Sequence, residues 1–162
     1  MKKVMVLMGS KSDLPAMEDT TGLLSELGIG FDVHIASAHR TPEYVRELVL
    51  SAPGRGIKVI IAAAGYAAHL AGVVAAHTNL PVIGVPLDSS SLQGFDALLS
   101  TAQMPGGVPV ASMGIGRAGA VNAALFAAEI LALSDEKLSK MLESYREAQR
   151  KRVLSADEEL KK

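Results

Sequence analysis

The feature that most constrains the fold of this chain is a regular alternation of short β-branched runs with longer helical patterns. Each predicted strand after the first follows a turn signal, such as the glycine-containing segments 28–30 and 54–56. This order predicts a parallel sheet covered by helices on both faces. Because crossovers are right-handed, the expected architecture is α/β, a flavodoxin-like three-layer αβα sandwich with a five-stranded parallel sheet of order 2-1-3-4-5. The predicted strands are 4–8, 31–36, 58–63, 81–85 and 108–112, and the predicted helices are 13–27, 42–52, 68–78, 92–102 and 117–133.

The sequence changes character at Ser134, after the predicted sheet is complete. A capped segment at 134–137 opens a further helix with a narrow apolar stripe, and the residues from 146 onward are mostly charged. Two interpretations stay open, a helix that packs partly on a neighbouring subunit and a solvated helix on its own domain. We expect residues 1–133 to form the flavodoxin-like domain and 134–162 to be a helical extension of it in an oligomer interface. The stripe consists of Leu138, Met141, Leu142 and Tyr145.

Composition excludes several classes of protein. The chain has 162 residues, the length of one ordinary domain, and its lack of cysteine excludes disulfide scaffolds, thiolate nucleophiles and cysteine-based zinc sites. A net charge of -1 provides no electrostatic footprint for nucleic acid or for an anionic membrane. The apolar run after Lys3 ends at Met8, too short for a signal peptide, and no run approaches the roughly 18 apolar residues of a membrane span. We therefore expect a cytoplasmic protein that binds neither nucleic acid nor membranes.

Polar, chemically capable side chains gather in the loops after the first four predicted strands. In an open parallel sheet, ligands bind beyond the carboxyl ends of the strands, near the topological switch point. The sequence therefore predicts a site at this edge of the sheet. The loops concerned are 9–13, 37–42, 64–70 and 86–91.

The first loop has two interpretations that can hold together. Its small residues and hydroxyl groups, placed before a helix N-terminus, are suited to bind an anion such as phosphate. Alternatively, Ser12 or Asp13 caps the following helix. The glycine and lysine spacing of a P-loop is absent.

The second loop is the most informative part of the chain. Arg40 supplies a planar donor fork suited to phosphate, and Pro42 occupies a favoured position for starting a helix. His39 has the one type of side chain whose ordinary pKa lies near neutrality, as a proton shuttle requires. Its position beside Arg40 at a predicted strand end favours a catalytic role over a structural one.

The other histidines carry weaker signals. His69 follows the third strand in a segment of small residues, where a ligand contact and a helix-start histidine bonded to the backbone both stay open. His34 lies inside a predicted strand and His77 late in a predicted helix, which indicates structural roles. No carboxylate completes a zinc site with His69 and His77, so we expect no metal.

Residues 114–119 match the dinucleotide pattern G-x-G-x-x-G literally. That fingerprint also needs a second strand with an acidic residue about twenty positions further on, which here falls in the terminal helix. Close packing of a helix on the sheet explains these glycines better than a nucleotide does. No G-x-S-x-G elbow exists, which argues against serine-hydrolase chemistry.

Taken together, these loops resemble one known family, N5-carboxyaminoimidazole ribonucleotide mutase, the class I form of the phosphoribosylaminoimidazole carboxylase catalytic subunit family. The similarity runs in order from the first strand to the penultimate helix and covers nearly the whole chain. The matching segments are 6–13 (VLMGSKSD), 37–42 (SAHRTP), 67–70 (AAHL), 81–86 (PVIGVP) and 103–111 (QMPGGVPVA).

The resemblance implies a homo-octameric isomerase of de novo purine biosynthesis that uses no cofactor. Its carboxylate would leave the exocyclic nitrogen as carbon dioxide and return at ring carbon 4, with His39 as general acid/base. His69 is the second expected catalytic residue. The residues expected to bind the ribose phosphate or line its site are Ser10, Ser12, Asp13, Ser37, Ala38 and Arg40. The loop expected to close over the imidazole and carbon dioxide contains Ala64, Gly65, Ala68, His69 and Leu70.

Two residues depart from the family pattern in this third loop. Tyr66 stands where a glycine is usual, and Ala71 replaces a proline that would stiffen the loop. A sister class carboxylates aminoimidazole ribonucleotide directly with carbon dioxide, but Arg40, Pro42 and His69 favour the mutase. A related nicotinate-dinucleotide carboxylase domain is thought to use a cysteine, which this chain lacks. A non-catalytic flavodoxin-like module that binds a nucleotide or flavin is the alternative outside enzymes.

Overall fold

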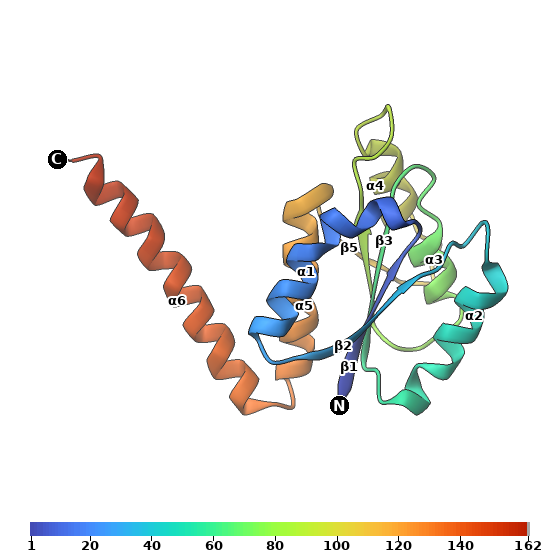
Figure 1. Cartoon of the computed structure of the whole chain (residues 1–162), viewed down its shortest axis with the longest axis horizontal. Helices are drawn as coiled ribbons and strands as arrows, with labels where there is room; N and C mark the ends of the chain where they lie inside the picture. The colour runs from blue at the N-terminus through green and yellow to red at the C-terminus, as the bar shows by residue number, and fades with distance from the viewer. Residues whose placement is uncertain (162) are drawn as a thin grey trace.

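The computed structural model describes residues 1–161 and contains one five-stranded parallel sheet (Figure 1). Its strand order is β2-β1-β3-β4-β5, so the predicted topology is confirmed. The order reverses direction between β1 and β3, which places the topological switch point there. The strands are β1 (Lys2–Met8), β2 (Gly30–Ile35), β3 (Val59–Ala64), β4 (Val82–Pro86) and β5 (Ala111–Ser112).

Helices cover both faces of this sheet. One core cluster joins it to α1, α5 and the start of α6, and a second cluster joins it to α2 and α3. None of the helices within residues 1–161 combines the length and the apolar composition that a membrane span requires. The helices are η1 (Lys11–Asp13), α1 (Leu14–Glu26), α2 (Pro42–Ser51), η2 (Pro53–Arg55), α3 (Leu70–Ala75), α4 (Phe95–Ala102), α5 (Gly116–Ala132) and α6 (Glu136–Glu159).

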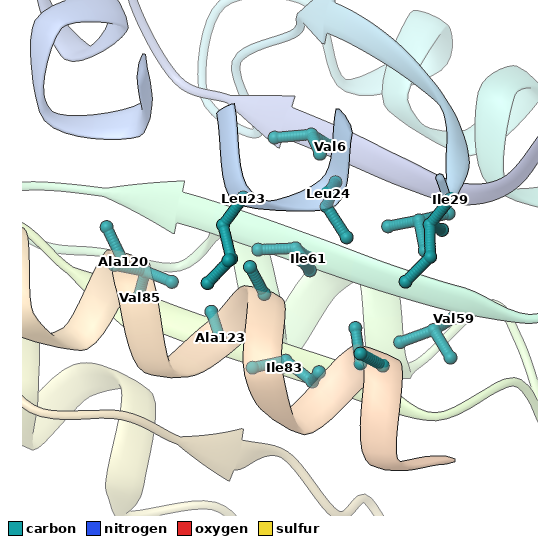
Figure 2. Close-up of a cluster of buried hydrophobic side chains, with 14 of the residues drawn as sticks. Val6, Leu23, Leu24, Ile29, Val59, Ile61, Ile83, Val85, Ala120 and Ala123 are labelled. Atoms are coloured by element: carbon teal, nitrogen blue, oxygen red, sulfur yellow. The ribbon is translucent and has the colours of Figure 1, made fainter. Parts of the chain in front are cut away.

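The central position of β3 in the sheet explains why its sequence is a continuous apolar run. Val59 and Ile61 point into the cluster with α1 and α5, as Figure 2 shows for both residues, whereas Ile60 and Ala62 belong to the cluster on the other face. Successive side chains of a strand alternate between faces, and both faces are covered here. Gly84 of β4 has no side chain because Thr101 of α4 occupies the space that a Cβ would need.

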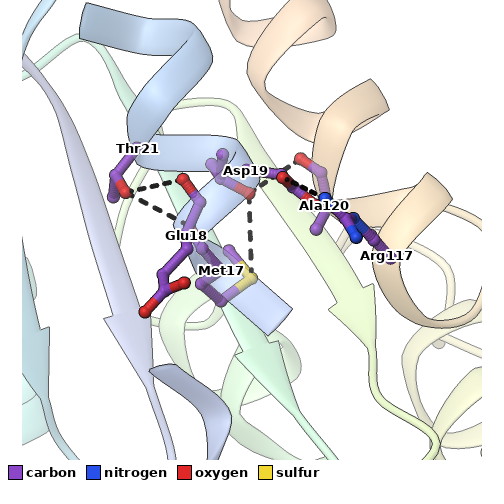
Figure 3. A network of polar contacts seen from close by, with 7 residues as sticks. Met17, Glu18, Asp19, Thr21, Arg117 and Ala120 are labelled. Atoms are coloured by element: carbon purple, nitrogen blue, oxygen red, sulfur yellow. Dashed lines mark hydrogen bonds and ion pairs between the residues drawn. The ribbon is translucent and has the colours of Figure 1, made fainter. Parts of the chain in front are cut away.

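Helix α5 begins within the glycine-rich segment 114–119 and packs against α1. The Thr20 hydroxyl, which is buried, donates to the carbonyl oxygen of Ala120 at 2.8 Å. At the solvent edge, Arg117 pairs with Asp19 through two hydrogen bonds (Figure 3). A Cβ at Gly119 would overlap the carbonyl oxygen of Gly114. This glycine is therefore required by the turn that precedes α5, and not by packing of the helix on the sheet as predicted.

Three predicted elements are shorter than expected. The fourth helix, predicted at 92–102, begins only at Phe95, because Gln93 and Gly94 have positive φ angles. The fifth strand, predicted at 108–112, pairs with β4 only at Ala111–Ser112. The chain before it turns at Gly107 with a φ of 95°, and Pro109 has no N–H to donate to a ladder. The third helix, predicted at 68–78, is confined to Leu70–Ala75, because the preceding residues form the irregular loop that borders the site.

Helix α6 begins where the sequence predicts it, with the Asp135 carboxylate accepting from the Leu138 amide at 3.1 Å as its N-cap. Leu138 and Leu142 are buried, and Met141 and Tyr145 pack against the same cluster. The predicted apolar stripe is therefore covered by the chain's own domain. Every residue from 146 to 161 is exposed, and Figure 1 shows this half of α6 projecting away from the sheet.

Candidate active site

A cavity of about 420 Å³ opens at the carboxyl ends of the strands around the switch point. It is formed by the loops after β1, β2 and β3, together with one residue from the loop after β4. This is the edge of the sheet at which the sequence predicts a site. The lining residues are Gly9, Ser10, Ser12, Asp13, Ser37, Ala38, His39, Arg40, Ala64, Gly65, Tyr66, Ala67, His69, Leu70 and Ser89.

The loop after β1 closes on itself as a capping box. The Ser10 hydroxyl accepts from the Ser12 amide at 3.3 Å, and the Asp13 carboxylate accepts from the Ser10 amide at 2.9 Å. The side chain that caps a helix amide is thus that of Ser10, at the start of η1, and not that of Ser12 or Asp13 as the capping interpretation proposed. Asp13 is the N-cap position of α1, but its side chain makes no capping bond there. The Ser12 hydroxyl donates to Ser10 Oγ at 2.9 Å, which holds two hydroxyl groups together at the cavity wall.

Asp13 is a buried carboxyl group at this wall, with 5% of its surface exposed. Burial raises the pKa of Asp13 above its ordinary value, and the hydrogen bond from the Ser10 amide opposes the rise only in part. A buried acceptor of this kind is suited to receive a hydrogen bond from a sugar hydroxyl, which would replace the water lost on burial.

The loop after β2 holds Arg40 by its own polar atoms. Its guanidinium donates to the Ser37 hydroxyl at 3.2 Å and to the Gly9 carbonyl oxygen at 2.6 Å. Thr41 fixes the loop by accepting from the Ser37 amide at 2.9 Å, and Pro42 is the first residue of α2, as predicted. Arg40 therefore joins the first two loops and presents its positive charge at the cavity.

His39 and His69 meet in this cavity, although 30 positions separate them in the chain. His39 Nε2 lies 2.8 Å from His69 Nδ1, and the ring centroids are 4.9 Å apart in an edge-on arrangement. A hydrogen bond between two imidazole nitrogens requires one donor and one acceptor, so only one of the facing nitrogens carries a proton. His69 is at the N-cap position of α3, but its side chain makes no capping bond there and faces His39 instead.

All the predicted site residues line the cavity except Ala68, which is buried in the loop after β3. Gly9, Ala67 and Ser89 also line the cavity; they lie in loops predicted to form the site but were not named individually as site residues. Tyr66 was treated only as a departure from the family pattern. Ser89 had a detectable signal, since it follows the fourth strand at the same edge. Its hydroxyl occupies the space of a Cβ at Gly65, so that glycine allows the loops after β3 and β4 to touch.

The remaining histidines lie outside this cavity. His77 Nδ1 is 2.8 Å from the Val73 carbonyl oxygen, and His34 is in β2, which fits the structural roles predicted for both. Among residues 1–161, no group of three or more histidine, aspartate or glutamate side chains is arranged to hold a metal ion. A larger hollow of about 980 Å³ runs between α1 and α6, but it contains neither histidine nor the polar loops of the sheet edge.

Fold and site together define a class, the flavodoxin-like α/β proteins that carry a polar, anion-suited cavity with a histidine pair at the switch point of the sheet. A family described as AIR carboxylase matches residues 3–152. The chain belongs to this AIR carboxylase family.

Individual relatives agree with this assignment. The N5-carboxyaminoimidazole ribonucleotide mutase of Bacillus subtilis is 52% identical over 155 residues, which is 96% of each chain. The mutase of the same name from Methanocaldococcus jannaschii is 51% identical over 158 residues, 98% of this chain and 97% of the relative. Among solved structures, PurE of Treponema denticola is 32% identical with a TM-score of 0.88 and full coverage of both chains.

Proposed function

We propose that this chain is a mutase of de novo purine biosynthesis that interconverts N5-carboxyaminoimidazole ribonucleotide and 4-carboxy-5-aminoimidazole ribonucleotide. The observation that carries the proposal is the convergence of His39, His69 and Arg40 on one cavity in a chain of this family. The curated relatives that share half of its residues are named for this activity.

The reaction moves a carboxylate and one proton. When the bond from the exocyclic nitrogen to the carboxylate breaks, the electron pair stays on nitrogen, which takes up a proton, and carbon dioxide is released. Ring carbon 4 then forms a bond to carbon dioxide and loses its own proton. The aminoimidazole ring supplies the electrons itself, so the proposed reaction uses neither a metal nor a nucleotide cofactor.

His39 is the group that we assign to the proton at ring carbon 4. In a neutral pair with His69, the shared proton resides on one ring while the other ring offers a lone pair. Such a pair can accept a proton at one step and return it at another without a charge having to leave the site. His69 also belongs to the loop after β3, so movement of that loop would change the contact between the two rings.

The remaining lining residues are assigned to binding. Arg40 would pair with the phosphate, and the backbone and hydroxyl groups of Ser10, Ser12 and Ser37 would add donors around it. Asp13 would accept from the ribose. The segment from Ala64 to Leu70 would cover the imidazole and trapped carbon dioxide, with Ala38, Gly65 and Leu70 closing the wall. Exclusion of water matters here, because bicarbonate, not carbon dioxide, predominates near neutral pH.

The proposal includes a cytoplasmic homo-octamer in which residues 1–133 form the catalytic domain and 134–162 extend it into an interface. Exposed apolar side chains on three separate elements support an assembly. They are Val33 and Ile35 on the edge strand β2, Phe95 and Leu99 on α4, and Val153 and Leu154 on α6. Apolar patches of this kind on several surfaces are typical of chains that pair with copies of themselves.

The test supplies the purified protein, without ATP, with N5-carboxyaminoimidazole ribonucleotide in one reaction and with aminoimidazole ribonucleotide plus bicarbonate in another. The carbon-carboxylated product is followed by absorbance. Rapid turnover in the first reaction alone is the expected result. Turnover in the second alone would place the chain in the direct carboxylase class. Turnover in neither, with ribonucleotide binding retained, would indicate a binding module.

A further inference from the structure

Tyr66 has an unusual backbone conformation at the mouth of the cavity. Its φ is 54°, in the left-handed region. Within residues 1–161, Gln93 is the only other residue, apart from glycines, with a positive φ. A residue with a Cβ is less stable in this conformation than in the right-handed form. A glycine would adopt it freely, so the tyrosine occupies a position where its own backbone preference works against it.

The surrounding loop forces this conformation on Tyr66. On one side, Gly65 packs against Ser89 so closely that no Cβ would fit. On the other side, Ala68 and Leu70 are each only 2% exposed and anchor the chain in the core. The short segment between these fixed points turns sharply, with the His69 amide donating to the Ala67 carbonyl oxygen at 2.8 Å. Strained residues held by a well-packed surrounding occur preferentially at functional sites.

The side chain of Tyr66 is not used to stabilise the fold. It is 63% exposed, although it lines the cavity that contains His39, His69 and Arg40. By contrast, Tyr145 packs against the core and its hydroxyl accepts from Gln149 at 3.0 Å. A large aromatic ring that is both strained and exposed gains free energy only when something covers it.

The chemistry of the cavity indicates what that covering group is. Its wall carries hydroxyl groups, the Asp13 carboxylate and the Arg40 guanidinium, which suit the sugar and phosphate of a ribonucleotide. Apart from the two imidazoles, which face one another, Tyr66 supplies the only aromatic ring among the described lining residues. A flat heteroaromatic ring entering the cavity therefore has one unoccupied aromatic face to stack on.

We propose that Tyr66 stacks on the imidazole ring of the bound ribonucleotide and serves as a specificity-determining residue that selects ligands carrying that ring. The inference rests on the proposed function, since it takes the ligand to be an aminoimidazole ribonucleotide. In this chain a tyrosine face thus covers a surface that a glycine at position 66 would leave to solvent or to the loop backbone.

Calorimetry with two ligands tests the stacking contact. Aminoimidazole ribonucleotide carries the ring, whereas ribose 5-phosphate has the sugar and phosphate alone. Stacking pairs are worth about 0.5–1.5 kcal/mol, so Tyr66→Ala is expected to weaken the first ligand about 2- to 12-fold and to leave the second unchanged. Tyr66→Phe, the matched control, keeps the aromatic face and should bind both ligands as the wild type does.

Tyrosine emission gives a second readout that a structural role would not affect. The chain has no tryptophan and three tyrosines, so a Tyr44→Phe, Tyr145→Phe double variant leaves Tyr66 as the sole emitter. Aminoimidazole ribonucleotide should change this emission and ribose 5-phosphate should not. If both ligands bind the wild type but Tyr66→Ala weakens them equally or not at all, the stacking inference is wrong. If the wild type binds neither ligand, the proposed function itself fails.

Discussion

At the residue scale, the contact between His39 and His69 leads to the most direct prediction about catalysis. His39→Asn removes the group assigned to the proton but leaves Ser10, Asp13 and Arg40 in place. We expect kcat to fall about 10²- to 10⁴-fold, the usual contribution of a general acid/base, with little change in the Kd for aminoimidazole ribonucleotide. Steady-state rates and calorimetry measure the two quantities. His77→Asn is the matched control, because His77 bonds the backbone outside the cavity. A His39→Asn variant with wild-type kcat would remove His39 from catalysis.

His34, which lies in β2 outside the cavity, should make the stability of the protein depend on pH. Burial lowers the pKa of His34, and the nearby positive charge of Arg55 lowers it further. Its Nε2 is buried without a hydrogen-bond partner in the described residues. Below about pH 6.5, the ordinary histidine pKa, the unfolded chain therefore takes up a proton before the folded chain does, and stability falls as pH falls.

The change that tests this linkage is His34→Gln, which removes the titrating group and keeps a polar side chain. The free energy of unfolding is measured in urea at pH 7.5 and at pH 5.5, at one protein concentration. We expect the wild type to lose more stability between these pH values than the variant. Equal losses in both proteins would show that His34 does not contribute to the pH dependence.

At the element scale, the start of α5 gives a prediction about packing. Gly119→Ala places a Cβ where the Gly114 carbonyl oxygen lies, so this turn must open or α5 must shift away from α1. We expect a loss of about 1–3 kcal/mol, the range for overpacked sites, seen as a lower Tm. Gly22→Ala is the control on α1, since nothing lies within 4 Å of its added Cβ. It should raise stability by about 0.5–1 kcal/mol through helix propensity. A Gly119→Ala protein as stable as the wild type would contradict the overlap.

Sequence patterns predicted the elements well where local signals and burial agree. The run at β3 is apolar throughout because helices cover both of its faces, and Pro42 starts α2 as its fixed φ favours. The pattern failed at β5, where apolar residues at 108 and 110 look like a strand but Pro109 and the turn at Gly107 prevent pairing. An apolar pattern reports burial and does not report which backbone groups find partners.

The sequence predicted the loops of the site and most of the residues that line it, but not the contacts between them. Parallel strands bring their carboxyl ends to one edge, so the residues of four separate loops were expected to lie together. That His39 and His69 touch, that Ser10 is the capping residue and that Ser89 fills the space beside Gly65 depend on loop conformations without periodic signals. The left-handed backbone of Tyr66 is likewise set by its anchored neighbours, not by its own preference.

At the scale of the whole molecule, α6 is the element whose second half has no packing partner among the described residues of the single chain. A helix of 24 residues extends about 36 Å at 1.5 Å per residue, and only its first turns, around Leu138 and Leu142, are buried. An isolated helix shorter than about 12–15 residues is marginal in water, so the projecting half gains little from propensity alone. The exposed Val153 and Leu154 on that half are suited to pack against another copy of the chain.

Truncation after Gln149 tests this role without disturbing the packing within the protomer. It removes residues 150–162 but keeps the buried stripe and the ion pair of Arg146 with Glu129 at 2.6 Å. We expect the mass measured by light scattering to fall from that of eight 16.9 kDa protomers towards smaller species. Leu154→Asp in the full chain should act in the same direction because it buries a charge in the proposed interface. Ser155→Asp adds the same charge at the next exposed position and is the matched control. An unchanged mass in both the truncated protein and Leu154→Asp would place the interface on β2 or α4 and leave α6 a solvated helix of its own domain.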